Sequence, residues 1–292
     1  MSTTNTMILV TGATGQLGAS VIEALLKKLP FSQLAALVRD EQKASHLAER
    51  GISIRLGTYD DSASLDQAMA GIDTVLLIAG TDEDNRLRQH QRVVDAAKEA
   101  GVQRIAYTSR ALKDRSTLAN QLMEGHFQTE DYIKASGLAY TLFRNILYLD
   151  TIPLFVGPAV FDRGIYLPAG EGRVAFALRS EMGEAMANAL LTPGTDNTVY
   201  ELTGSESYSF SDVATMLTDL SGREVRYTDT PAVAFAEQMQ QRGLPEFRVQ
   251  RMIGFMTDIK NGQEDTVSAD LEHLLGRKPA SLREGLRALF TL

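Results

Sequence analysis

Three glycines near the start of the chain limit its fold more than any other feature of the sequence. The apolar stretch Met7–Val10 leads into Gly12, Gly15 and Gly18, and the amphipathic run Ala19–Leu29 follows. This order predicts a strand, a tight turn and a helix. Gly12 permits the sharp turn, Gly15 leaves room for a pyrophosphate, and Gly18 lets the helix pack against the strand. Because free N–H groups at the start of a helix bind phosphate, the pattern predicts a dinucleotide site; a glycine-rich turn without a ligand is the alternative.

Short apolar runs alternate with amphipathic runs through the first 145 residues. The apolar runs predict strands at Met7–Val10, Leu34–Val38, Ile52–Leu56, Thr74–Ala79, Arg104–Thr108 and Ala139–Arg144. The amphipathic runs predict helices at Gln16–Leu29, Glu41–Arg50, Ser62–Ala70, Asn85–Ala100 and Leu118–Ser136. Each strand–helix–strand step implies a right-handed parallel crossover, so we expect an α/β fold with a Rossmann-type doubly wound parallel sheet.

The pattern becomes less regular after Asn145, which predicts a second and smaller domain. A helix at Glu181–Leu191 and a strand at Thr198–Leu202 then indicate a return to the main sheet, and the rest is mostly helical. We expect a dinucleotide-binding domain of residues 1–150, to which 180–203 return. The smaller, mostly helical substrate domain would comprise residues 151–179 and 204–292. It would pack across the carboxyl ends of the strands, where doubly wound sheets bind ligands.

Composition excludes several classes of function. The net charge of −8 and the absence of a basic run argue against a nucleic-acid partner. The chain has no cysteine, which excludes disulfides and thiol catalysis, and its four scattered histidines argue against a metal site. No apolar segment approaches the roughly 18 residues that cross a membrane, and no signal peptide is visible. We therefore expect a cytoplasmic protein with no membrane association.

The end of the second predicted strand indicates which nucleotide is bound. Arg39 lies 21 positions after Gly18, where the adenosine ribose is normally held. Arginine at this point can pair with a 2′-phosphate, whereas a carboxylate would accept hydrogen bonds from a free 2′-hydroxyl. Lys43 adds a second positive charge. We expect NADP (NADPH) as the cofactor; Asp40 leaves NAD as the less favoured alternative, and a solvated loop cation is the other interpretation of Arg39.

The tyrosine–lysine pair of many reductases with this N-terminal pattern is missing. None of the nine tyrosines is followed by lysine four residues later, and Tyr132, on the fifth predicted helix, is followed there by Ser136. Since that pair supplies a proton to the substrate oxygen, a hydride acceptor for this chain should need little acid assistance. Quinones and extended conjugated cations meet this condition, because they delocalise the charge of the hydride.

Several motifs together resemble the NmrA-like atypical short-chain dehydrogenase/reductases. They are Val10–Gly18, Leu37–Arg39 with Lys43, Ile105–Ser109, His126 with Thr129 and Glu130, and Tyr140–Asn145. Within the family the chain looks most like the branch of bacterial NAD(P)H:quinone oxidoreductases and triphenylmethane reductase, over nearly its whole length. The resemblance implies a Rossmann domain and a small C-terminal domain with a cleft between them. It is also compatible with a homodimer.

The resemblance implies roles for individual residues. It places Gly12, Thr14, Gly15, Gln16, Leu17 and Gly18 at the pyrophosphate, Arg39 with Lys43 at the 2′-phosphate, Ile78, Ala79 and Gly80 at the riboses, and Tyr107, Thr108 and Ser109 beside the nicotinamide. Asn145 and Tyr148 would face the cleft as catalytic residues. Relatives often carry Gly-Asp-Tyr where this chain has Gly57-Thr58-Tyr59, which leaves an adenine contact by residue 58 without support.

His126 is the sharpest candidate for catalysis. Isoflavone-reductase-like relatives carry lysine at the matching position, and the quinone-reductase branch carries histidine. Histidine could bind a ribose hydroxyl or a reduced quinone oxygen, and its pKa suits proton donation near neutrality. The alternative is a partly exposed histidine paired with Glu130 on one helix face. We expect His90 at the surface. We expect Arg144 to form a structural ion pair or to donate hydrogen bonds to the backbone, and not to act as a catalyst.

These observations predict an NADPH-dependent reductase that transfers hydride to a quinone or a similar conjugated acceptor. A non-catalytic NAD(P)-binding redox sensor or regulator of the NmrA type is the alternative from another class, and the missing tyrosine–lysine pair fits it equally well. An isomerase or dehydratase acting on an extended sugar substrate is a third interpretation, although such enzymes normally use the tyrosine.

Overall fold

Seven strands form one sheet, in the order β3-β2-β1-β4-β5-β6-β9. From β3 to β5 the neighbours pair in parallel, and Ile8 of β1 lies opposite both Leu34 of β2 and Thr74 of β4. The strand order turns at β1, as in a Rossmann sheet, so the predicted fold class is confirmed. The strands are β1 (Ile8–Val10), β2 (Leu34–Val38), β3 (Ser53–Leu56), β4 (Thr74–Leu77), β5 (Arg104–Arg110), β6 (Ala139–Asn145) and β9 (Thr198–Leu202).

The computed structural model describes residues 6–194 and 196–292, which fall into two units. The first unit comprises the residues up to Arg110, Leu122–Arg144 and Arg179–Tyr200. The second comprises Ala111–Gln121, Asn145–Leu178 and Glu201–Leu292.

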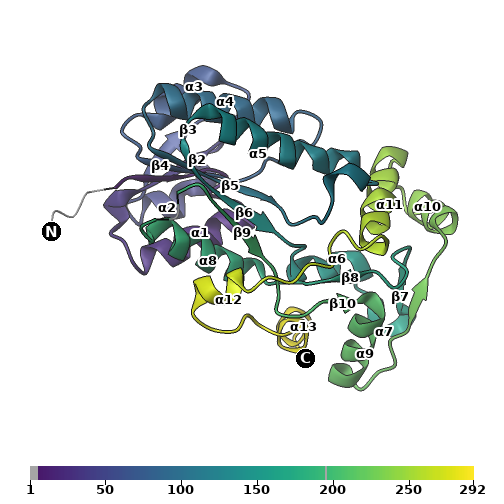
Figure 1. The fold of residues 1–292 in the computed structure, drawn as a ribbon. Helices are drawn as coiled ribbons and strands as arrows, with labels where there is room; N and C mark the ends of the chain where they lie inside the picture. Colours follow the sequence, from purple (N-terminus) through teal and green to yellow (C-terminus); the bar gives the residue numbers. More distant parts are fainter. Residues whose placement is uncertain (1–5, 195) are drawn as a thin grey trace. The chain divides into compact units, whose positions relative to one another are not determined.

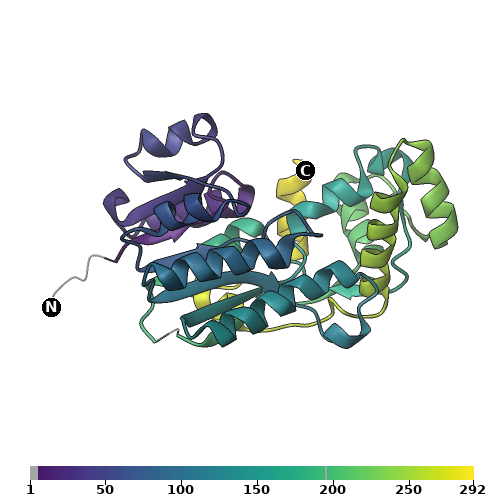
Figure 2. The ribbon, with the colours of Figure 1, turned by 90° about the horizontal axis from the view of Figure 1, so that it is seen from above.

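Helices cover both faces of the sheet in the first unit. Helices α3, α4 and α5 lie on one face, and α1 and α8 lie side by side on the other (Figure 1; Figure 2). This layering is the one expected for parallel strands that are joined by crossovers. The helices are α1 (Gln16–Leu26), α2 (Ser45–Ala48), α3 (Ser62–Met69), α4 (Arg86–Glu99), α5 (Glu124–Ser136) and α8 (Arg179–Leu191), with 3₁₀ turns η1 (Phe31–Gln33), η2 (Gln42–Ala44) and η4 (Gln121–Met123).

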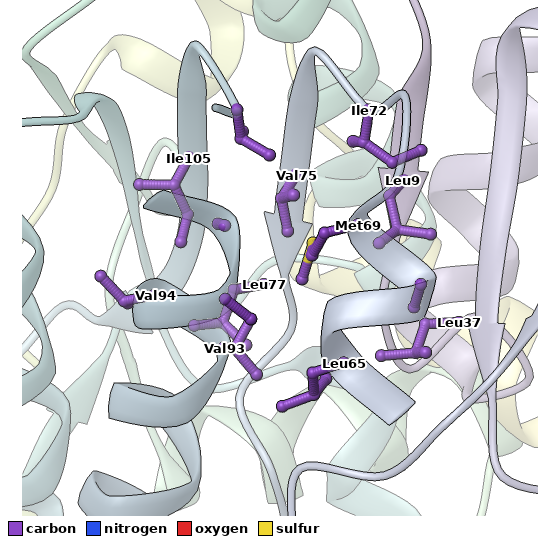
Figure 3. Close-up of a cluster of buried hydrophobic side chains, with 14 of the residues drawn as sticks. Leu9, Leu37, Leu65, Met69, Ile72, Val75, Leu77, Val93, Val94 and Ile105 are labelled. Atoms are coloured by element: carbon purple, nitrogen blue, oxygen red, sulfur yellow. The ribbon is translucent and has the colours of Figure 1, made fainter. Parts of the chain in front are cut away.

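A hydrophobic cluster joins the sheet to α3 and α4 (Figure 3). Leu9, Val75 and Ile105 from three neighbouring strands pack there with Met69 of α3 and Val94 of α4, and all five are buried. Every residue of β1, β2 and β4 is buried, because helices cover both faces of these strands. This burial explains why the strands read as continuous apolar runs.

The second unit is mostly helical and contains two short strand pairs. One pair is parallel, β7 with β11, and the other is antiparallel, β8 with β10. Its elements are η3 (Arg115–Thr117), η5 (Leu149–Thr151), α6 (Ile152–Val156), α7 (Val160–Arg163), β7 (Ile165–Leu167), β8 (Arg173–Val174), β10 (Tyr208–Ser209), α9 (Phe210–Ser221), β11 (Tyr227–Asp229), α10 (Ala232–Gln241), α11 (Glu246–Lys260), α12 (Asp270–Leu275) and α13 (Leu282–Phe290). None of the helices described is both long and apolar enough to span a membrane.

The helix expected at Gln16–Leu29 ends at Leu26, and two other predicted helices differ more from the observed ones. The helix expected at Glu41–Arg50 is a 3₁₀ turn followed by the four residues of α2. The Asp40 carboxylate accepts hydrogen bonds from the N–H groups of Gln42 and Lys43, which tightens this turn. The helix expected from Leu118 begins only at Glu124, because 3₁₀ turns and bends occupy the residues before it.

Candidate functional site

A cavity of about 720 Å³ lies in the first unit, at the carboxyl ends of β1 to β4. The loop after each of these strands contributes to its wall, through Gly12–Gly15, Arg39–Lys43, Gly57–Tyr59 and Ile78–Asp82. Ligands of doubly wound sheets bind at this edge. The volume lies within the range of ligand pockets, roughly 300–1,000 Å³.

The glycine turn leaves the start of α1 open. Gly12 has a φ of +58°, a backbone conformation that favours glycine. Gly15 is the N-cap of α1, with no side-chain cap and no acidic residue in the first helical turn. A Cβ on Gly18 would lie 2.3 Å from the carbonyl oxygen of Gly12, so a glycine is required where the helix comes close to the turn. The uncapped N–H groups can therefore bind an anion.

The remaining residues predicted at the pyrophosphate divide into two groups. Thr14 is exposed and lines the cavity, whereas the side chain of Leu17 is buried and Gly18 is packed, so these two can offer only main-chain groups. Gln16 is exposed, and its amide oxygen accepts a hydrogen bond from Arg179 at the start of α8.

The cavity carries a positive charge where the 2′-phosphate is expected. Arg39 and Lys43 are exposed and line its wall, and no hydrogen bond or ion pair is found for Arg39 within the described residues. The Asp40 carboxylate is held by two backbone N–H groups and lies 3.9 Å from the Lys43 ammonium. Asp40 therefore balances Lys43, and Arg39 remains as the charge available to a phosphate.

Tyr59 and Thr11 tie the ends of the strands together below the cavity. The Tyr59 hydroxyl donates to the carbonyl oxygen of Ile78 at 2.9 Å and also contacts the Thr11 hydroxyl, which accepts from the Ile78 N–H at 2.9 Å. Burial raises the pKa of Tyr59 well above its usual value. Thr58 lines the cavity next to Tyr59. We had no reason to expect Thr11, although a polar residue that directly follows a buried strand is the signal that could have identified it.

In the loop after β4, three consecutive backbone N–H groups each donate a hydrogen bond to a side chain. The N–H of Ile78 donates to Thr11, that of Ala79 donates to the Thr108 hydroxyl at 2.9 Å, and that of Gly80 donates to Nε2 of His90 at 3.1 Å. These N–H groups are occupied, so the loop presents a rigid wall to a ligand. Thr108 is buried and acts here as a support for that wall.

His90 is buried, so the expectation of a surface histidine is wrong. Its side chain is completely enclosed, and burial together with the charge of Arg86 lowers its pKa to about 3. The neighbouring Arg86 is also buried, and its guanidinium donates to the carbonyl oxygen of Leu122 at 2.9 Å.

His126 is buried against Tyr107. The Tyr107 hydroxyl lies 2.9 Å from Nδ1 of His126. Burial, together with the charges of Arg86 and Arg110, holds the pKa of His126 well below 6.5. Burial also raises the pKa of Tyr107 above its usual value, so both groups are neutral around pH 7. The expected titration of His126 near neutrality is therefore wrong.

Glu130 pairs with Arg144 and not with His126. Its carboxylate accepts two hydrogen bonds from the Arg144 guanidinium, at 3.0 and 2.8 Å, and lies 3.3 Å from the Lys134 ammonium. The interpretation of His126 as a partly exposed partner of Glu130 is wrong, and the structural ion pair of Arg144 is confirmed. Ser109 is buried beside this pair.

Asn145 and Tyr148 contact each other in the second unit. The Asn145 amide nitrogen donates to the Tyr148 hydroxyl at 3.2 Å, and the intervening Leu147 N–H donates to the buried Glu264 carboxylate at 3.3 Å. Asn145 is 1% exposed, and its Oδ1 has no hydrogen-bond donor within the described residues. A buried acceptor without a partner is uncommon and indicates a place for a ligand or water.

Several known proteins are similar to most of the chain. Quinone oxidoreductase 2 of Escherichia coli (strain K12) is 37% identical over 287 residues, which cover 98% of this chain and 99% of that relative. An NAD(P)H azoreductase of Xenophilus azovorans is 30% identical over 82% of each chain. The crystal structure of the Escherichia coli NADPH-dependent quinone oxidoreductase complexed with NADPH has a TM-score of 0.91 at 37% identity and covers 97% of this chain and all of its own.

Triphenylmethane reductase from Citrobacter sp. has a TM-score of 0.90 at 34% identity, covering 98% of this chain and 100% of that chain. Residues 4–288 match the NmrA-like family. Together with the Rossmann sheet and the glycine turn, these matches show that the chain belongs to the NmrA-like family.

Proposed function

We propose that this NmrA-like protein is an NADPH-dependent oxidoreductase that transfers hydride to a quinone or a similar conjugated acceptor. Bound NADPH would supply the hydride. Relatives named as quinone oxidoreductase and azoreductase, similar over most of their length, support the oxidoreductase class. The single observation that carries the proposal is the cavity over the glycine turn with the free cation Arg39 in its wall.

The cavity suits a phosphorylated dinucleotide in shape and charge. Its wall combines the uncapped start of α1 with the rigid loop after β4, so a diphosphate and a ribose would be held without rearrangement of the chain. The guanidinium of Arg39 can make paired hydrogen bonds to a 2′-phosphate. We assign Gly12, Gly15, Arg39 and Lys43 to this part of the cofactor.

The groups assigned to the reacting end are neutral. His126 and Tyr107 of the first unit carry no charge around pH 7. No tyrosine–lysine pair is available to donate a proton. Such a site suits an acceptor whose reduced form takes its proton from water, which favours quinones over simple ketones.

Steady-state oxidation of NADPH tests the proposal. The purified protein should consume NADPH in the presence of small benzoquinones and naphthoquinones, and much more slowly with simple ketones. Arg39→Ala should raise the KM for NADPH while leaving the KM for the quinone unchanged. If the protein binds NADPH and consumes none with any quinone, the sensor interpretation is correct and the proposal is wrong.

A further inference from the structure

Two buried groups of hydrogen bonds lie next to each other in the first unit. One joins the Gly80 N–H, His90 on α4 and Thr129 on α5, and the other joins Tyr107 on β5 to His126; the hydroxyls of Thr129 and Tyr107 interact where the two groups meet. The direction of each bond is limited by atoms that can only donate or only accept. Following these directions from one group to the next determines which nitrogen of each histidine ring carries hydrogen.

The backbone fixes His90. The Gly80 N–H can only donate, so Nε2 of His90, 3.1 Å away, must present a lone pair. A neutral imidazole carries its hydrogen on the other nitrogen, so Nδ1 donates to the Thr129 hydroxyl at 3.0 Å. The Thr129 hydroxyl in turn donates to the carbonyl oxygen of Gly125 at 2.7 Å, an atom that can only accept.

The Tyr107 hydroxyl determines the tautomer of His126. The Tyr107 hydroxyl lies near two acceptors, Thr129 Oγ1 and, at 2.9 Å, Nδ1 of His126. Because Thr129 Oγ1 already accepts the hydrogen of His90 and an imidazole nitrogen is the stronger acceptor, we place the Tyr107 hydrogen in the bond to Nδ1. If Tyr107 donates to Nδ1, the hydrogen of the neutral His126 ring is on Nε2. Among the described residues, the only hydrogen bond of the His126 ring is the one at Nδ1, so Nε2 remains available as a donor.

We propose that Tyr107 is a positioning residue that fixes His126 as the Nε2–H tautomer, so that His126 donates a hydrogen bond to an oxygen of the hydride acceptor. Hydride addition to a quinone places a negative charge on oxygen, and a fixed N–H donor stabilises that charge without giving up its proton. The proton that completes the hydroquinone comes from water. The role in catalysis rests on the proposed function, whereas the tautomer does not.

The surroundings of His126 agree with a donor that stays neutral. Two guanidinium groups face it, Arg86 from α4 and Arg110 from β5, and both disfavour an imidazolium. The Glu130 carboxylate on the same helix is engaged by Arg144 and Lys134. A neutral imidazole whose Nδ1 accepts a hydrogen bond carries its hydrogen on Nε2, so the ring can still donate from Nε2.

Long-range ¹H–¹⁵N NMR of the full chain labelled with ¹⁵N-histidine measures the tautomers directly. The four histidines give four ring systems, and His46→Gln and His273→Gln identify the two exposed ones. We expect the Nδ1–H form for His90 and the Nε2–H form for His126. In Tyr107→Phe, His126 should lose its single tautomer while His90 keeps its own. Tyr132→Phe, which removes a hydroxyl that donates to Asp95 on the surface, should change neither.

Kinetics of His126 variants test the catalytic role. The amide N–H of glutamine can replace an Nε2–H donor, whereas that of asparagine lies nearer the position of Nδ1. His126→Ala and His126→Asn should lower kcat with a quinone by about 100-fold, and His126→Gln should recover most of the loss. An Nδ1–H form of His126 in the wild type would overturn the tautomer assignment. Equal kcat values for the Gln and Ala variants would overturn the donor role, and the NMR result stands even if no quinone is reduced.

Discussion

Replacing Arg39 by alanine should change the preference between the two nicotinamide cofactors. At the end of β2 Lys43 is balanced by Asp40 at 3.9 Å, so Arg39 is the cation left unbalanced in this part of the cavity wall. A hydrogen bond between charged groups contributes about 1.5–3 kcal/mol. Because Arg39 is exposed and therefore screened, we take the lower half of this range, about 1.5–2 kcal/mol, or about 10- to 30-fold in Kd.

Fluorescence titration of the reduced nicotinamide measures this effect. Arg39→Ala should weaken NADPH binding by about 10- to 30-fold and NADH binding by less than about 3-fold. Lys43→Ala serves as the matched control, and it should cost NADPH only about 3-fold because Asp40 already offsets its charge. High salt should reduce the Arg39 effect. Equal losses for NADPH and NADH in Arg39→Ala would refute the assignment of this side chain to the 2′-phosphate.

Three further predictions concern the glycine turn, the buried ion pair and pH. Gly15→Val should abolish dinucleotide binding in a protein that remains folded by circular dichroism, because its Cβ would already lie 3.1 Å from the Gly12 carbonyl oxygen and the added methyl groups would occupy the phosphate approach; retained affinity would contradict the turn assignment. Arg144→Ala should lower the free energy of unfolding by about 2–3 kcal/mol in urea titrations, because it removes the bidentate partner of the buried Glu130 carboxylate and leaves it with Lys134 and Ser109. Burial raises the pKa of Glu130, but the bonds from Arg144 outweigh this effect and the pKa is lowered. The stabilisation by this ion pair is therefore present above about pH 4.5 and is lost as the pH falls further. The Arg144→Ala variant should be less sensitive to acid than the wild type, and equal sensitivity would count against this account. Since the pKa of His126 lies well below 6.5, kcat with a quinone should show no histidine step between about pH 5.5 and pH 8.5, and a step that disappears in His126→Gln would contradict the neutral ring.

The strands and the glycine turn could be predicted because their causes are local. Leu34–Val38 is buried on both faces, so five consecutive apolar residues mark the strand, and the observed bounds are the predicted ones. The turn depends on glycines that are adjacent in the sequence, and Gly12 has the positive φ that this turn requires. Periodicity and turn chemistry were sufficient for these elements.

The buried polar groups could not be predicted because their partners are distant in the sequence. Arg86 and Arg88 stand near His90 in the sequence and favour a surface position for it, yet Arg86 is itself buried and donates to the carbonyl oxygen of Leu122, 36 residues away. His126 and Glu130 have the spacing of a helical pair, but the bidentate contact of Glu130 with Arg144 on β6 takes precedence over it. Spacing along a helix identifies candidate neighbours, and tertiary packing decides between them.

A single-turnover reaction under anaerobic conditions tests the central claim most directly. The protein is mixed with one equivalent of NADPH and one of a soluble naphthoquinone, and both products are quantified by chromatography. The account predicts one NADP⁺ and one hydroquinone per NADPH consumed, with a rate that falls in His126→Ala. Bound NADPH that stays reduced in the presence of the quinone would contradict the account and identify the protein as a nucleotide sensor.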